Sequence, residues 1–165
     1  MTELERQALR DIVFFCFERG ILIEATGSRV IGGAREDSDY DYIIAEHSMI
    51  NGVYGRGALS TYTELKTLLE RLGFTAPLAD NPELDGMYSE EDDDQRRNIY
   101  YLGSLNIILV PNKSRWNEWI EATYIAKKLS PPTKAERVAV FSAMRTGTPV
   151  YQAMDIARNG ATGDA

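Results

Sequence analysis

Two short apolar runs joined by a glycine-containing connector constrain the fold of this chain more than any other feature. The runs are ILIEAT (residues 21–26) and YDYIIA (residues 40–45); both are rich in β-branched, aromatic or other apolar residues and contain no proline. Gly27, Gly32 and Gly33 interrupt the segment between them. The pattern predicts two strands brought side by side by a connector about as long as a short helix, RVIGGARED.

Two aspartates lie one residue apart where the second run begins. Alternate residues of a strand share a face, so Asp39 and Asp41 are expected to project to the same side, roughly 7 Å apart along the backbone. Two carboxylates placed in this way repel each other unless a cation lies between them. Oxygen ligands of this kind suit Mg²⁺, which keeps its other positions for water and phosphates. The pair therefore predicts a site for Mg²⁺ or Mn²⁺.

The triplet Gly27-Ser28-Arg29 follows the first predicted strand. Glycine lets the backbone turn and approach a ligand closely, which leaves N–H groups free to point at phosphate oxygens. Ser28 adds a hydroxyl group, and Arg29 adds a guanidinium whose fork fits a phosphate. Beside a metal site, this arrangement is typical of phosphoryl or nucleotidyl transfer. The alternative is a plain tight turn followed by an Asp-rich strand.

The rest of the chain predicts helices around a small sheet. Capping boxes begin at Thr2 and Thr133, and glycines suggest where helices end. Helices are expected over residues 2–20, 60–73 and 114–129 and from residue 133 onward, and a hairpin over residues 98–110 with its turn at Gly103-Ser104. This order predicts an α/β (α+β) fold with a small mixed sheet flanked by helices.

The chain is long enough for one domain, which we expect over residues 1–146. Residues 147–165 carry no strong pattern and are expected to be a poorly ordered or short-helical tail, with at most a turn near residues 151–158. The acidic run Glu90–Asp94 has two interpretations, a solvated loop or a docking surface that mimics the charge of a nucleic acid.

Composition excludes several classes of protein. A hydrophobic content of 44% and a charged content of 26% indicate a globular chain, and the net charge of −7 argues against sequence-blind binding to nucleic acid. A single cysteine, Cys16, rules out a disulfide framework and is expected to be buried. The N-terminus lacks the pattern of a secretory signal, and the apolar run of residues 12–17 is too short to span a bilayer. We therefore expect a cytoplasmic protein that does not bind membranes.

The segment GSRVIGGAREDSDYDYII resembles the Gly-Ser, Asp-x-Asp signature of the DNA polymerase β-type nucleotidyltransferase superfamily. Further along, GSLNIILV, WNEWIEATYIAKKL and KAERVAVFSAM resemble small phage-encoded nucleotidyltransferase-like proteins, so that the resemblance covers most of residues 21–146. It implies a minimal nucleotidyltransferase-like core with C-terminal helices, and a location in the host cytoplasm if a phage encodes the chain.

The resemblance also implies roles for individual residues. Gly27 and Ser28 would hold the phosphates of a nucleoside triphosphate (NTP), and Asp39 and Asp41 would bind the divalent metals. Active members carry a third carboxylate on a later strand, which helps bind metal and activates the acceptor hydroxyl. The matching position here is Asn106, a residue that the phage-like proteins also carry there. An amide oxygen can ligate a hard cation but cannot act as a base. Three alternatives follow: the site uses Asn106 as a neutral ligand, takes a carboxylate from Glu90–Asp94, or has lost catalysis.

Two main hypotheses of function remain open from the sequence, and a structural scaffold that binds no Mg²⁺–nucleotide is a third. In the first, the chain transfers a nucleoside monophosphate from an NTP to a hydroxyl of tRNA, a protein or a small molecule, with Mg²⁺. In the second, the chain keeps the fold as a catalytically impaired binding module, such as an antitoxin or an anti-defence inhibitor that binds a host protein.

Overall fold

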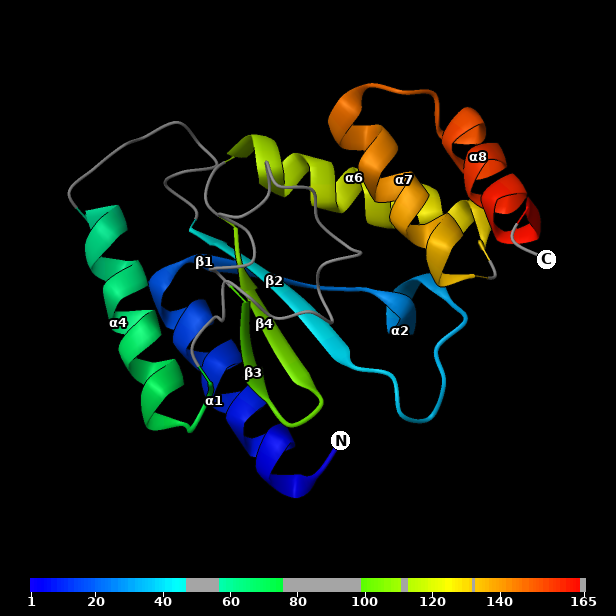
Figure 1. Ribbon diagram of the computed structural model, residues 1–165. Helices are drawn as coiled ribbons and strands as arrows, with labels where there is room; N and C mark the ends of the chain where they lie inside the picture. Colours follow the sequence, from blue (N-terminus) through cyan, green and yellow to red (C-terminus); the bar gives the residue numbers. More distant parts are fainter. Residues whose placement is uncertain (47–56, 76–98, 111–112, 132, 164–165) are drawn as a thin grey trace.

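A four-stranded mixed sheet forms the centre of the protein (Figure 1). The computed structural model describes residues 1–46, 57–75, 99–110, 113–131 and 133–163. The strands are β1 (Ile21–Thr26), β2 (Tyr40–Glu46), β3 (Ile99–Leu102) and β4 (Leu105–Leu109), in the order β1-β2-β4-β3. Strand β2 is parallel to β4, whereas the β1–β2 and β3–β4 pairs are antiparallel. The predicted α/β fold with a small mixed sheet is confirmed.

Two helices cover one face of the sheet. Helices α1 (Glu3–Arg19) and α4 (Gly57–Arg71) contact each other and bury the larger apolar cluster. Its fully buried members include Ile12, Ile44, Leu65, Leu69, Leu105, Ile107 and Leu109. Cys16 is buried in the same cluster, as expected, and the loss of water around it raises the pKa of its thiol to about 12.

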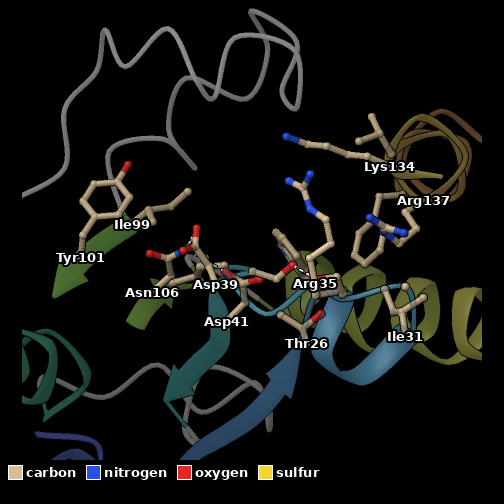
Figure 2. Close-up of a pocket in the computed structure, with 18 of the residues that line it drawn as sticks. Thr26, Ile31, Arg35, Asp39, Asp41, Ile99, Tyr101, Asn106, Lys134 and Arg137 are labelled. Carbon is tan, nitrogen blue, oxygen red and sulfur yellow. Dashed lines mark hydrogen bonds between the residues drawn. The ribbon is translucent and has the colours of Figure 1, made fainter. Parts of the chain in front are cut away.

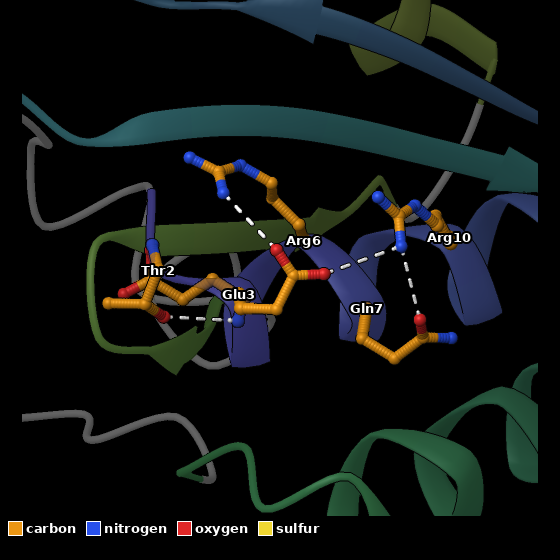
Figure 3. Close-up of polar contacts among 6 residues, drawn as sticks. Thr2, Glu3, Arg6, Gln7 and Arg10 are labelled. Carbon is orange, nitrogen blue, oxygen red and sulfur yellow. Dashed lines mark hydrogen bonds and ion pairs between the residues drawn. The ribbon is translucent and has the colours of Figure 1, made fainter.

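The ends of α1 have the predicted caps. Thr2 Oγ1 accepts a hydrogen bond from the Glu5 backbone N–H at 3.2 Å, and the Glu5 carboxylate accepts one from Thr2 N at 3.1 Å. At the other end Gly20 takes the left-handed conformation that a helix stop requires. Figure 3 shows the polar contacts that link Glu3 with Arg6 and Arg10; these side chains are exposed, so the contacts add little stability.

The other face of the sheet is covered by the C-terminal helices. Helix α6 (Lys113–Leu129) packs Trp116 onto a second cluster with Ile43, Ala45, Ile108 and Val110. Helices α7 (Lys134–Thr146) and α8 (Val150–Gly163) form an outer group with α6 and the short helix α2 (Ser28–Ile31), around a third cluster. Figure 1 shows this group on the side of the sheet opposite α1 and α4.

The expectation for the C-terminal tail was wrong in extent, because α8 occupies residues 150–163 rather than a short turn. Tertiary contacts explain the difference. Met154 is buried in the third cluster, and Arg158 Nε donates to the buried Glu136 of α7 at 3.0 Å.

The capping box expected at the start of α7 is only half formed. The Thr133 side chain accepts the Glu136 backbone N–H at 3.2 Å, whereas the Glu136 carboxylate pairs with Arg158.

Smaller differences concern boundaries. Helix α4 begins at Gly57, three residues before the predicted Ser60. Ala58 and Leu59, which lie between them, have high helix propensity. The hairpin turn at Gly103-Ser104 is confirmed, with Gly103 at φ 57°. The acidic run Glu90–Asp94 lies outside the described residues. None of the helices in the described segments is long and apolar enough to cross a membrane.

Candidate metal and nucleotide site

A row of polar side chains crosses all four strands at one end of the sheet. The strand register places Thr26 opposite Asp41, Asp41 opposite Asn106, and Asn106 opposite Tyr101. Residues directly opposite each other across a ladder share a face of the sheet, so these four side chains lie on the same side. Figure 2 shows Asp39, Asp41 and Asn106 gathered at this place, with Tyr101 beyond them.

The row continues the face of the sheet that α6 covers. Asp41 alternates with the buried Ile43, and Asn106 alternates with the buried Ile108. Beneath α6 this face is therefore apolar, and it becomes polar where the helix no longer covers it. A buried hydrogen bond of 2.7 Å between the hydroxyls of Thr26 and Thr123 ties the β1 end of the row to α6.

Asn106 joins the two aspartates. Its Nδ2 donates to Asp41 Oδ1 at 2.9 Å and to Asp39 Oδ2 at 3.3 Å. The expectation that both carboxylates project to one side is therefore confirmed, although Asp39 precedes β2 rather than belonging to it. Burial raises the pKa of the Asp41 carboxyl and the nearby Asp39 charge raises it further, while the hydrogen bond from Asn106 lowers it.

Gly27 is required by the position of Asp41. Gly27 has φ 75°, a conformation that L-residues other than glycine rarely adopt, and a Cβ atom there would overlap the Asp41 carboxylate. Its carbonyl oxygen accepts the backbone N–H groups of Val30 and Ile31, so α2 begins directly after it. Both Gly27 and Ser28 line the same pocket as the aspartates.

Arg29 has a different place from the one expected. Its Nη2 donates to the carbonyl oxygens of Glu36 at 2.9 Å and Ser38 at 2.8 Å, and its guanidinium lies 4.2 Å from the centre of the Tyr40 ring. Arg29 is not among the described residues that line the pocket. These contacts make it a residue that holds the loop leading into Asp39.

The pocket around this row has a volume of about 610 Å³, which is large enough for a nucleotide. Its opposite wall is basic and comes from α7: Lys134, Arg137 and Arg145 line it, and Arg35 joins them from the loop after α2. Figure 2 shows Arg35, Lys134 and Arg137 on one side of the aspartates and Tyr101 on the other. A carboxylate cluster therefore faces a cluster of cations across open space.

Sequence reasoning did not identify the α7 side chains as site residues. Their helical spacing is a signal that could have found them, because positions 134, 137, 141 and 145 fall on one face of a helix. Phe141 lies in this stripe and packs edge-on against Trp119, with ring centroids 5.1 Å apart. Both rings line the pocket.

The donor set fits a hard divalent cation. Asp39 and Asp41 place carboxylate oxygens within 3.3 Å of one atom, Asn106 Nδ2, so a partial positive charge already lies between them. Two carboxylates, with the remaining positions left to water and phosphate, are a usual arrangement for Mg²⁺. Over the part of the chain that the structure describes, no group of three His, Cys, Asp or Glu side chains could hold a metal. Asn106 turns its Nδ2 toward both carboxylates, so its amide would have to rotate before Oδ1 could ligate a cation beside them.

Comparison with known proteins adds no relative: the chain matches no family model, no curated protein and no solved structure.

Proposed function

We propose that this protein is a metal-dependent nucleotidyltransferase, which transfers a nucleoside monophosphate from an NTP to a hydroxyl group and releases pyrophosphate. The observation that carries the proposal is the pairing of Asp39 and Asp41 with a basic wall across one pocket. The negative charges of a triphosphate must be offset by cations along the chain of phosphates, and the bound metal must itself be held by carboxylates. The acceptor would be tRNA, a protein or a small molecule in the cytoplasm.

Each part of the pocket has a place in this proposal. Asp39 and Asp41 would hold Mg²⁺ or Mn²⁺, and a bound cation would neutralise phosphate charge and polarise the α-phosphate. Gly27 and Ser28 would contact the phosphates nearest the aspartates, and Arg35, Lys134 and Arg137 would bind the far end of the triphosphate. The Trp119–Phe141 pair offers the base an apolar surface.

Asn106 limits the chemistry that the site can perform. The acceptor oxygen would bond to the α-phosphorus while the bond from that phosphorus to the bridging oxygen breaks. An amide cannot take the proton that the hydroxyl loses, so the proton would pass to water. The protein would therefore accelerate the reaction by positioning and charge neutralisation, without a general base at this position.

The same residue favours a second candidate function, a module that binds nucleotide or a host protein without turnover. Asn106 already bridges Asp39 and Asp41, and the hydrogen bonds stabilise the pair without a third carboxylate. A site that needs only to bind a metal nucleotide requires no more than this.

The test is transfer of radiolabel from an α-labelled NTP in the presence of Mg²⁺. We expect wild-type protein to release pyrophosphate and Asp41→Asn to lose this activity by at least about 100-fold, because Asp41 is the less exposed of the two carboxylates and the more constrained metal ligand. Asp37→Asn is the matched control, since Asp37 lines the same pocket but is exposed and pairs loosely with Arg35 at 3.6 Å. Mg²⁺-dependent NTP binding without any turnover would favour the binding module.

A further inference from the structure

The polar row ends at a residue with no role in the proposal above. Tyr101 lies on the edge strand β3, opposite Asn106, and its side chain lines the pocket. The neighbouring Tyr100 lies on the other face of the sheet, in the apolar cluster under α1 and α4. Tyr101 therefore presents a phenol to the reaction side of the sheet, next to the amide that joins the two aspartates.

The hydroxyl of Tyr101 is buried and finds no hydrogen-bond partner among the described residues. A buried hydroxyl without a partner is unfavourable, and tyrosine hydroxyls are usually paired when they are buried. Because this hydroxyl lies on the same side of the sheet as Asp39, Asp41 and Asn106, a ligand bound there would supply the missing hydrogen bond.

The pocket has a direction that identifies this ligand. In a nucleotidyl transfer the attacking oxygen and the departing pyrophosphate lie on opposite sides of the α-phosphorus. The cations that suit the pyrophosphate, Arg35, Lys134 and Arg137, all lie on one side of the aspartates, and Tyr101 lies on the other (Figure 2). The attacking oxygen must then arrive from the Tyr101 side.

We propose that Tyr101 binds the acceptor: its hydroxyl hydrogen-bonds the attacking hydroxyl group, beside Asn106, at the β3 edge of the pocket. This inference rests on the proposed nucleotidyl transfer and assigns the acceptor side of the same site. The acceptor oxygen forms a bond to the α-phosphorus, the bond to the bridging oxygen breaks, pyrophosphate leaves toward α7, and the acceptor proton passes to water.

The same side of the pocket indicates the kind of acceptor. Ile99 and Ile108 flank Tyr101 there, and both are almost fully buried. Of the described residues that line this side, none is a lysine or arginine, and Asp39 contributes a negative charge. Among the described residues on this side, none offers a positive charge to a phosphate close to the reacting hydroxyl. We therefore expect the acceptor group to be an uncharged alcohol rather than the phosphorylated end of a sugar.

The experiment uses the full chain with Mg²⁺, a saturating NTP and two probe acceptors, glycerol and glycerol 3-phosphate. Mass spectrometry measures the nucleotidyl product, and calorimetry measures the Kd of the Mg²⁺–NTP complex. We expect glycerol to react at least about 10-fold faster than its phosphate ester. Tyr101→Phe should slow the glycerol reaction by at least about 10-fold and change the NTP Kd by less than about twofold, as for an interaction made only with the attacking group.

Tyr100→Phe is the matched control, since it removes the same oxygen one residue away on the opposite face of the sheet. It should leave both measurements within about twofold of wild type. A Tyr101→Phe protein that transfers to glycerol as fast as wild type, or a wild-type protein that prefers glycerol 3-phosphate, overturns the acceptor assignment and leaves the transferase proposal standing. NTP binding without product from either probe overturns the acceptor assignment, and the transferase proposal falls with it only if wild-type protein also releases no pyrophosphate in the α-labelled NTP assay. Absence of NTP binding by wild-type protein removes the nucleotide site itself.

Discussion

The amide nitrogen of Asn106 lies 2.9 Å from Oδ1 of Asp41, on the neighbouring parallel strand, and 3.3 Å from Asp39 Oδ2. One neutral side chain thus holds two carboxylates together where a cation would otherwise be needed. If the proposed cation binds here, the arrangement links stability to its binding, because any change at Asn106 alters the repulsion between the aspartates.

Asn106→Asp tests this link. Without divalent cation, a third carboxylate at this position should lower the free energy of unfolding by about 1–3 kcal/mol, since a donor is lost and a like charge is added. Mg²⁺ should restore stability and raise the Tm of the variant more than that of wild type. Asn106→Ala is the control, which should lose stability without a comparable response to Mg²⁺. Equal Mg²⁺ shifts in all three proteins would contradict the assignment of a metal site here.

Gly27→Ala should disrupt the same site from its other side. The substitution strains a backbone at φ 75° and forces the Asp41 carboxylate to move, so we expect a loss of about 2–4 kcal/mol in unfolding free energy. Gly147→Ala is a matched control with φ 72° and no atom within 4 Å of the added carbon, so it should cost only about 1 kcal/mol. Similar losses in chemical denaturation would show that Asp41 does not depend on Gly27.

Glu5 should make stability depend on pH in the acid range. Hydrogen bonds from Ser104 hold the pKa of its carboxyl below the ordinary value of 4.5, with burial acting in the opposite direction. Because the folded-state pKa is depressed, the stabilisation is complete above the unfolded-state value and is lost as pH falls through the folded-state pKa. Urea unfolding between about pH 6 and about pH 3 should therefore be less pH-dependent in Glu5→Gln than in wild type. Identical slopes would exclude this role for Glu5.

Arg158→Ala tests how α8 is attached. Arg158 binds a Glu136 side chain that is almost fully buried, so removing it leaves a buried carboxylate with less compensation and should cost about 1–2 kcal/mol. Arg6→Ala removes an exposed pair with Glu3 and should change stability by less than about 0.5 kcal/mol. Limited proteolysis should also cleave α8 faster in Arg158→Ala. Equal behaviour of the two variants would mean that apolar contacts alone hold the helix.

Much of the fold can be predicted from local patterns. The alternation Asp39, Asp41, Ile43 indicates the shared face directly, and the caps at Thr2 and Gly20 bound the first helix. Tertiary packing decides the rest. Helix α8 is stabilised because Met154 packs in the third cluster and Arg158 pairs with Glu136 of α7. These partners cannot be predicted from the sequence around Met154 and Arg158.

The residues of the candidate site also differ in whether local sequence predicts their positions. Asp39, Asp41, Gly27 and Ser28 are close in sequence, and their clustering could be predicted from strand and turn geometry. Asn106 is predictable only through a family resemblance, because the parallel register of β2 and β4, which brings it to Asp41, cannot be read from local patterns. The role of Arg29 was not predictable, because its partners are backbone carbonyl groups, which no residue type reveals.

The most direct test of the central claim is calorimetric titration of the protein with each NTP, with and without Mg²⁺, in wild type and in Asp39→Asn/Asp41→Asn. We predict Mg²⁺-dependent binding to wild type, weakened by at least about 100-fold in the double variant while its Tm changes little. Binding of equal strength in both proteins, or no binding of any Mg²⁺–NTP complex to wild type, would contradict it.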